Sequence, residues 1–257
     1  MQKKRISIIG SGNVASHLAQ VFFDNNLPLI EIYSRNIVEG EKLAKKVNAN
    51  FIRDIKSVGL QTEIIIMAIS DDAIPIVSKE LNLNGQILAH TSGIANTEDL
   101  KIATKNYACF YPLQTFTKGH IVDFNLIPIL INASNSQTLS DLKNIAFKLS
   151  NNVKEISDLE RQKLHLSAVI VNNFTNHLFS LSSKYLAENK IDFNLLKPLI
   201  QETVNKISNS DPIANQTGPA KRNDLNTIEK HFSLMEDEDL KEIYKILTKS
   251  IYDTHND

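Results

Sequence analysis

The stretch that decides the fold is RISIIGSGNVA, at Arg5–Ala15. Its isoleucine-rich run over 6–9 predicts a short buried strand, and residues 16–26 form an amphipathic pattern that predicts a helix. Glycines separate the two elements. A strand that turns through glycines into a helix is the signature of a dinucleotide-binding site, whereas the alternative is a glycine turn of the kind found in any α/β protein.

Each position of this turn has a physical role in such a site. Gly10 permits a tight turn, Gly12 lets the backbone approach a pyrophosphate, and a small residue at Ala15 lets helix and strand pack closely. The anion would lie on the unpaired N–H groups and positive dipole of the new helix. We therefore predict that the cofactor-binding turn consists of Gly10, Ser11, Gly12, Asn13, Val14 and Ala15.

Composition narrows the class of protein. The 257 residues are 42% hydrophobic and 22% charged, with a formal net charge of −1, which is typical of a soluble globular protein and offers no basic field for nucleic acid. No apolar run reaches the roughly 18 residues that a membrane span needs, and the start of the chain is interpreted as a first strand, not a signal peptide. Cys109 is the single cysteine, so we expect no internal disulfide, no metal site and a cytoplasmic protein.

Strand and helix patterns alternate over the first 156 residues, which predicts a mostly parallel, doubly wound sheet. The continuous apolar run at 63–69 is typical of a central parallel strand. The predicted strands are 6–9, 29–33, 50–52, 63–69, 86–90, a strand from 107, 127–131 and 152–156, and the predicted helices are 16–26, 38–47, 71–81 and 136–149.

The end of the second predicted strand bears on the choice of nucleotide. NAD-binding folds place an acid about 20 residues beyond the glycines to bind the ribose 2′-hydroxyl. Here the strand ends in Ser34 and Arg35, and a guanidinium offers a planar fork of donors to a 2′-phosphate. The pattern favours NADP over NAD. The alternatives are that Arg35 is an ordinary solvated arginine and that Glu31 contacts the ribose.

Polar residues also follow the next two strands, at the edge where such sheets bind ligands. Ser70 and Asp71 follow the strand at 63–69, where they either contact the cofactor or cap the next helix. His90, Thr91 and Ser92 end the following strand. We predict cofactor contacts for His90 and Thr91 and a substrate-orienting role for Ser92, against the alternative that His90 is a core residue satisfied by the backbone.

From residue 157 the pattern becomes helical. Ser157 and Glu160 form a capping box, and the absence of proline and glycine up to Asn189 predicts one helix of about thirty residues. Further helices are expected over 193–208 and 238–252, with a loop at 211–224. We therefore predict an NADP-binding Rossmann domain at 1–156 and an all-helical substrate and dimerisation domain at 157–257.

The long helix is apolar on most sides, which predicts that it is buried. It nevertheless carries a narrow polar stripe at Arg161, His165, Asn172 and Asn176, since each residue advances the helix by 100°. Buried polar groups need partners, so this stripe either satisfies itself inside the bundle or faces a cleft. We expect a cleft, with His165 as proton donor and Asn172 as a substrate contact.

Two loop residues are candidates for binding the polar part of a substrate. Gln114 follows the strand that begins at 107, in a loop whose proline and aromatic residues would either wall a pocket or only bridge two strands. Arg222 could bind a carboxylate through two hydrogen bonds, pair with Asp224, or cap a helix end.

Together these motifs give the chain a family resemblance. It is similar to a bacterial family of Rossmann-plus-helical proteins described as NADP oxidoreductases, and more distantly to pyrroline-5-carboxylate reductase and the β-hydroxyacid dehydrogenases. The matching motifs are GSGNVA at 10–15, YSR at 33–35, SDDAI at 70–74, HTSG at 90–93, FYPLQTF at 110–116, the helix from His165 to Leu178, and QTGPAKRND at 216–224. The resemblance implies a Rossmann fold and an NADP cofactor, and it says little about the substrate.

One motif of that wider group is absent. Hydroxyacid dehydrogenases carry Lys-x-x-x-Asn on the helix that opens their second domain, whereas here Lys163 is followed four residues later by Ser167. We expect His165 and Asn173 to replace the pair, from separate turns about 12 Å apart along the helix. The sequence thus predicts an NADP-dependent reductase of a small imine, ketone or keto acid that dimerises through its helices. The alternative is a non-catalytic NADP-binding regulatory or assembly protein.

Overall fold

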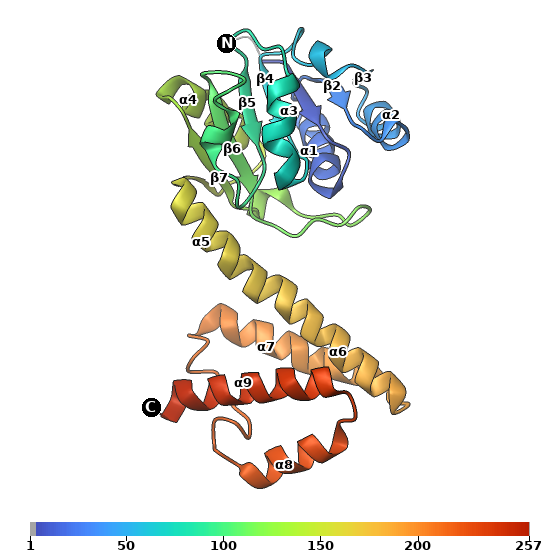
Figure 1. Ribbon diagram of the computed structural model, residues 1–257, viewed down its shortest axis with the longest axis vertical. Coiled ribbons are helices and arrows are strands. Elements are labelled where there is room, and N and C mark those ends of the chain that lie inside the picture. Colours follow the sequence, from blue (N-terminus) through green and yellow to red (C-terminus); the bar gives the residue numbers. More distant parts are fainter. Residues whose placement is uncertain (1–3, 257) are drawn as a thin grey trace. The chain divides into compact units, whose positions relative to one another are not determined.

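A computed structural model describes residues 4–256 (Figure 1). The chain divides into two compact units, 1–172 and 173–257. The predicted domain boundary at 156 and 157 falls where strands give way to helices. The compact units divide later because the helix that starts at Asp158 packs on the sheet unit.

The first unit contains one eight-stranded sheet with the order β3-β2-β1-β4-β5-β6-β7-β8. The strands are β1 (Ile6–Ile9), β2 (Leu29–Tyr33), β3 (Asn50–Ile52), β4 (Ile64–Met67), β5 (Ile87–His90), β6 (Tyr107–Pro112), β7 (Ile129–Ala133) and β8 (Val153–Glu155). Strands β1 to β6 are parallel, and β7 runs antiparallel to β6. This order, with its switch between β1 and β4, is that of dinucleotide-binding sheets. The predicted α/β Rossmann class is confirmed.

Helices cover both faces of this sheet (Figure 1), because alternate side chains of each strand point to opposite faces. Ile6 and Ile8 pack on one face with Phe22 of α1, whereas Ile9 packs on the other with Ile74 of α3. The helices of this unit are α1 (Asn13–Asp24), α2 (Ile37–Lys46), α3 (Ile74–Glu80), α4 (Ser136–Ala146) and α5 (Asp158–Ala168). The sheet is therefore held between two apolar layers, and its carboxyl edge is left for loops.

The long helix begins at the predicted capping box. The Ser157 side chain accepts from the Glu160 N–H, and the Glu160 side chain accepts from the Ser157 N–H. The helical run continues from α5 through a π-helical segment, Val169–Phe174, into α6 (Thr175–Glu188). The prediction of one long helix to about residue 189 is confirmed. The prediction that it is buried is wrong for the single chain, since Leu166 is 61% and Val171 70% exposed.

The second unit contains only helices among its described residues. They are α6, α7 (Lys197–Asn209), α8 (Leu225–Leu234) and α9 (Glu238–Asn256). Helix α8 was not predicted, although Asp224 caps it by accepting from the Thr227 N–H. Across the part of the chain that the structure describes, no helix has both the length and the apolarity to cross a membrane.

Candidate functional site

The glycine turn between β1 and α1 has the geometry that the sequence predicts. Gly10 has φ +126°, and a Cβ there would lie 2.1 Å from the Ala68 carbonyl oxygen, so only glycine fits. Ala15 is fully buried beneath the turn. Gly10 and Ala15 therefore bring the start of α1 close to the sheet.

Gly12 leaves open space at the start of α1. It is the N-cap residue, it makes no side-chain cap, and no acidic residue lies in the first turn. A Cβ on Gly12 would meet nothing within 4 Å. The first N–H groups of the helix thus face an open cradle, which fits a phosphate group electrostatically and sterically.

The end of β2 lies beside this turn. The Ser34 hydroxyl is 2.7 Å from the Ser11 hydroxyl, so the two loops are in contact. Arg35 is exposed, and within residues 4–256 its guanidinium makes no side-chain hydrogen bond or ion pair. Asn36 caps α2 by accepting from the Glu39 N–H at 3.1 Å. A free guanidinium beside a helix N-terminus fits an additional phosphate.

Glu31, the alternative ribose ligand, has another role. Its side chain is 2% exposed. It accepts a hydrogen bond from the Ser7 hydroxyl at 2.5 Å and one from the Gly59 N–H at 3.2 Å. Because its carboxylate is used inside the sheet, a ribose contact through Glu31 is not supported.

The residues after β4 are accessible. Ser70 and Asp71 are exposed. Ser70 occupies the N-cap position of the 3₁₀ turn Asp71–Ala73 but makes no side-chain cap. The capping alternative therefore has no hydrogen bond to support it, and the predicted cofactor contacts of these two residues stay predictions.

The side chains of His90, the last residue of β5, and of Thr91 point inward. His90 is fully buried, its Nδ1 accepts from the Ser92 N–H at 3.1 Å, and its Nε2 makes no hydrogen bond within the described residues. Burial lowers the pKa of His90 to about 3, so the ring is neutral at pH 7. Thr91 donates to the Met67 carbonyl at 3.4 Å. Any contact of a cofactor with His90 would have to come through its backbone.

Ser92 organises the loop that follows β5. Its hydroxyl oxygen accepts from the N–H groups of Ile94 and Ala95, at 3.0 and 2.9 Å. The side chain is 7% exposed. This turn fixes the backbone that leads to Thr97. The predicted substrate-orienting role of Ser92 stays a prediction.

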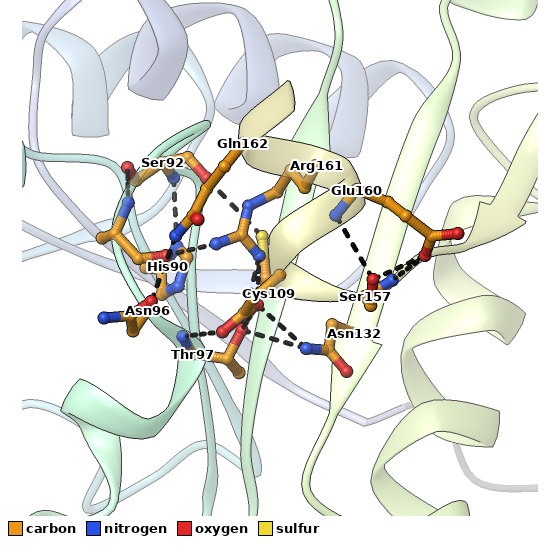
Figure 2. A network of polar contacts seen from close by, with 12 residues as sticks. His90, Ser92, Asn96, Thr97, Cys109, Asn132, Ser157, Glu160, Arg161 and Gln162 are labelled. Carbon is orange, nitrogen blue, oxygen red and sulfur yellow. Dashed lines mark hydrogen bonds and ion pairs between the residues drawn. The ribbon is translucent and has the colours of Figure 1, made fainter. Parts of the chain in front are cut away.

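The first turn of α5 is anchored to the same loop by Arg161 (Figure 2). Arg161 is fully buried and donates to the carbonyl oxygens of Gly93 and Ala95 and to Asp158, the last at 2.7 Å. Gln162 donates to the Ile94 carbonyl at 2.9 Å. These bonds satisfy three consecutive loop carbonyls, so the helix and the loop form one rigid joint.

Asp158 completes this joint. It accepts from the Thr97 N–H at 2.7 Å and from the Asn132 amide at 2.9 Å. Burial opposes ionisation, but the hydrogen bonds from Thr97 and Asn132 and the charge of Arg161 hold the pKa of Asp158 below its usual value. The ionised carboxylate therefore compensates the buried guanidinium.

His165 lies one helical turn after Arg161 on α5, against the loop that follows β5. A Cβ at Gly93 would lie 2.3 Å from Nδ1 of His165, so the imidazole packs directly against the glycine backbone. Nδ1 is also 3.0 Å from the hydroxyl oxygen of Tyr111, at the end of β6. His165 is thus held at the carboxyl edge of the sheet, with Nε2 free of hydrogen bonds from residues 4–256.

Other predicted site residues are not brought to this place by the described contacts. Gln114 is exposed and accepts from the Thr115 N–H at 2.8 Å. Asn172 is exposed in the π-helical segment, and π-helical turns are frequent at functional sites. Asn173 and Arg222 belong to the second unit and are exposed. Their roles stay predictions.

A groove of about 770 Å³ lies elsewhere in the first unit. It is formed by α1, α2 and the loop over 118–125, and its lining includes neither the glycine turn residues 10–15 nor His165. The candidate site is therefore an open edge of the sheet, defined by its backbone and polar groups.

Solved structures with the same architecture show which proteins this chain is similar to. A protein from Bacteroides fragilis, provisionally described as an NADP oxidoreductase, is 33% identical to this chain, and the match covers 98% of both chains with a TM-score of 0.90. The chain belongs to that protein's family. Residues 127–251 match a family described as a domain of unknown function (DUF2520), and residues 1–89 match shikimate/quinate 5-dehydrogenase. No curated protein matches significantly.

More distant structures share the fold. A Thermotoga maritima protein is 21% identical, with 97% of this chain and 98% of that chain covered and a TM-score of 0.71. A reductive aminase from Aspergillus terreus, in complex with NADPH4, cyclohexanone and allyl amine, is 13% identical, with coverage of 99% and 97% and a TM-score of 0.71.

Three features of this family member's site were missed by sequence reasoning. They are the contact of Tyr111 with His165, the packing of His165 on Gly93, and the hydrogen bonds of Arg161 to the loop after β5. A partial signal exists, because HTSG at 90–93 places a glycine directly after polar strand-end residues. Nothing in the sequence pairs that glycine with a histidine 72 positions later.

Proposed function

We propose that the protein is an NADP-dependent oxidoreductase that reduces a small imine, ketone or keto acid. The observation that carries the proposal is the open cradle at Gly12, with Ser34 and the free Arg35 beside it. The B. fragilis relative, described as an NADP oxidoreductase, supports both the activity and the cofactor. The reductive aminase, crystallised with a ketone and an amine, supports the substrate class. The sequence resemblance to pyrroline-5-carboxylate reductase is consistent with the same chemistry.

Different residues of the chain bind different parts of the nucleotide. The N–H groups that begin α1 bind the pyrophosphate, and Ser34 and Arg35 bind the 2′-phosphate. When bound, NADPH supplies the hydride. The strand order places β5 two strands from β1, about 10 Å away, so the loop with Gly93 lies toward the far half of a nucleotide bound on α1.

His165 supplies the proton. Imidazole is suited to general acid catalysis near neutral pH, and His165 is fixed on the loop after β5 with Nε2 available. The proton on Nε2 goes to the oxygen or nitrogen that gains negative charge as the double bond is reduced. Ser92 orients the substrate, and Gln114 or Asn172 binds its polar group. The predicted roles of Asn173 and Arg222, which belong to the second unit, stay predictions.

The alternative is a regulatory or assembly protein that binds NADP without chemistry. It is favoured by one observation, the absence of the Lys-x-x-x-Asn pair. The residue four positions after Lys163 is Ser167 instead of asparagine. A panel of small ketones, keto acids and ketone–amine mixtures with NADPH separates the two. NADPH oxidation with at least one substrate is expected; tight NADPH binding with no oxidation across the panel would favour the alternative. A cytoplasmic location stays a prediction from the single cysteine.

A homodimer through the helices is also part of the proposal. Within the described part of the second unit, only Ala220 and Met235 are buried apolar residues, while apolar side chains such as Leu199 and Ile207 are 64% and 51% exposed. Surfaces of this kind are usually covered by a partner.

We expect sedimentation velocity at micromolar concentration to show a dimer. The apolar helix surfaces described above would then be removed from water. A monomer throughout the micromolar range would contradict the dimer while leaving the nucleotide site unaffected.

A further inference from the structure

The imidazole of His165 is held at one edge by two groups from different elements. Gly93, in the loop after β5, lies so close to Nδ1 and Cγ that a Cβ would approach them to 2.3 and 2.5 Å. Tyr111, from β6, places its hydroxyl oxygen 3.0 Å from Nδ1. The two rings are edge to face, with centroids 6.0 Å apart. Both supports act on the Nδ1 edge, which leaves Nε2 for a ligand.

The Tyr111 hydroxyl has no other hydrogen-bond partner within residues 4–256. The side chain is 9% exposed, and burial raises the pKa of Tyr111 to about 12. Its hydroxyl therefore stays protonated and uncharged near neutral pH. A neutral phenol can both donate and accept a hydrogen bond, which a carboxylate cannot.

We propose that Tyr111 is a positioning residue that holds His165 in one orientation through every protonation state of the catalytic cycle. This inference rests on the proposed role of His165 as proton donor. In the imidazolium, the Nδ1–H donates to the Tyr111 oxygen. When a neutral ring instead carries its proton on Nε2, the Tyr111 O–H donates to Nδ1.

The proton transfer keeps this contact intact. The Nε2–H bond of the imidazolium breaks, its electron pair stays on the ring, and the proton joins the heteroatom of the substrate. The ring is then neutral, with its remaining proton on Nδ1, where the Tyr111 oxygen still accepts it. Solvent returns a proton to Nε2 before the next turnover. His165 therefore need not rotate during the cycle, and misorientation of a catalytic group is costly.

The test replaces only the hydroxyl, by Tyr111→Phe. We expect kcat to fall about fivefold, equivalent to roughly 1 kcal/mol for the loss of one hydrogen bond, with KM for the carbonyl substrate and the Kd for NADPH within about twofold of wild type. Tyr107→Phe is the matched control, since Tyr107 begins the same strand and makes no described contact with His165; its kcat should be unchanged.

A spectroscopic measurement tests the contact without turnover. In apo protein with ¹⁵N-labelled histidine, and with His165→Gln to assign the signal, we expect a protected, hydrogen-bonded Nδ1 of His165 that becomes solvent-exchanging in Tyr111→Phe. Gly93→Ala should have the same effect, because its Cβ would displace the ring.

The outcomes separate this inference from the proposed function. Unchanged kcat in Tyr111→Phe, or an unchanged Nδ1 signal, would overturn the role of Tyr111 while wild-type NADPH-dependent turnover still supported the proposed function. Absence of turnover in the wild type would instead contradict the proposed function and, with it, the catalytic role of Tyr111.

Discussion

Replacing His165 by alanine is expected to lower kcat by about 10²- to 10⁴-fold, the usual range for loss of a general acid or base. The physical reason is that His165 is the proposed donor of the proton that the reduced heteroatom takes up, and alanine has no proton to give. NADPH affinity should survive, because the first N–H groups of α1 and the guanidinium of Arg35 are untouched. Steady-state kinetics with a carbonyl or imine substrate, together with NADPH binding, measures both quantities.

The fold should tolerate this change. His165 is partly exposed on α5, and alanine is the best helix former. His255→Ala provides a matched control, since His255 lies in the last turn of α9 and should leave kcat unchanged. Turnover of His165→Ala at the wild-type rate would remove His165 from the mechanism.

Replacing Gly12 by valine is expected to weaken NADPH binding roughly 100-fold, a loss of about 2.7 kcal/mol, without lowering the melting temperature. Gly12 has φ −73°, which any residue adopts, and a Cβ there meets nothing within 4 Å. The new side chain would occupy the space proposed for the pyrophosphate. Calorimetric titration with NADPH and a thermal melt of the apo protein measure the two effects.

Gly10→Ala is the informative contrast to this variant. At Gly10 a Cβ would lie 2.1 Å from the Ala68 carbonyl oxygen, with the backbone at φ +126°, so alanine should lower the melting temperature itself. If Gly12→Val bound NADPH as tightly as wild type, the cradle would not be the nucleotide site.

Local patterns in the sequence located the strands and α-helices of the first unit, although some bounds differ: β7, Ile129–Ala133, begins two residues later than predicted. Strand β2 has the predicted bounds, 29–33, because a mostly buried run of β-branched and aromatic residues is a strong local signal. Strand β3 also has its predicted bounds, 50–52. Helix α1 begins at Asn13, three residues before the predicted start, since Gly12 provides the N-cap position without a capping side chain. The capping box was also predictable, because it requires only a serine at 157 and a glutamate three residues later, at 160.

The second unit shows where local patterns fail. Helix α8, Leu225–Leu234, was missed although Asp224 and Thr227 form a local cap signal, since the sequence prediction assigns no element between the loop at 211–224 and the helix at 238–252. The apolar character of the long helix predicts burial, but burial depends on what covers the helix. Leu166 and Val171 are exposed in the single chain. Sequence periodicity cannot distinguish an apolar helix face that stays exposed from one that another element covers.

The candidate site was predictable in its parts and not in its contacts. Strand ends at Ser34, Ser70 and His90 follow from topology, since carboxyl ends of parallel strands share one edge. The pairing of His165 with Tyr111 joins residues 54 positions apart, and the role of Arg161 depends on two carbonyls of a loop more than 60 residues earlier. Such contacts arise from packing of α5 on the sheet, which no local pattern encodes.

The most direct test of the account is calorimetric titration of the folded wild-type protein with NADPH and with NADH. The account predicts one NADPH site per chain and binding at least about 10-fold tighter than NADH, since the added 2′-phosphate gains charge-assisted hydrogen bonds from Ser34 and Arg35; Arg35→Ala should remove most of this preference. Equal affinity for the two carriers would contradict the role of Arg35. Absence of binding heat with both, in protein whose melting temperature is also unchanged by either, would contradict the nucleotide site itself.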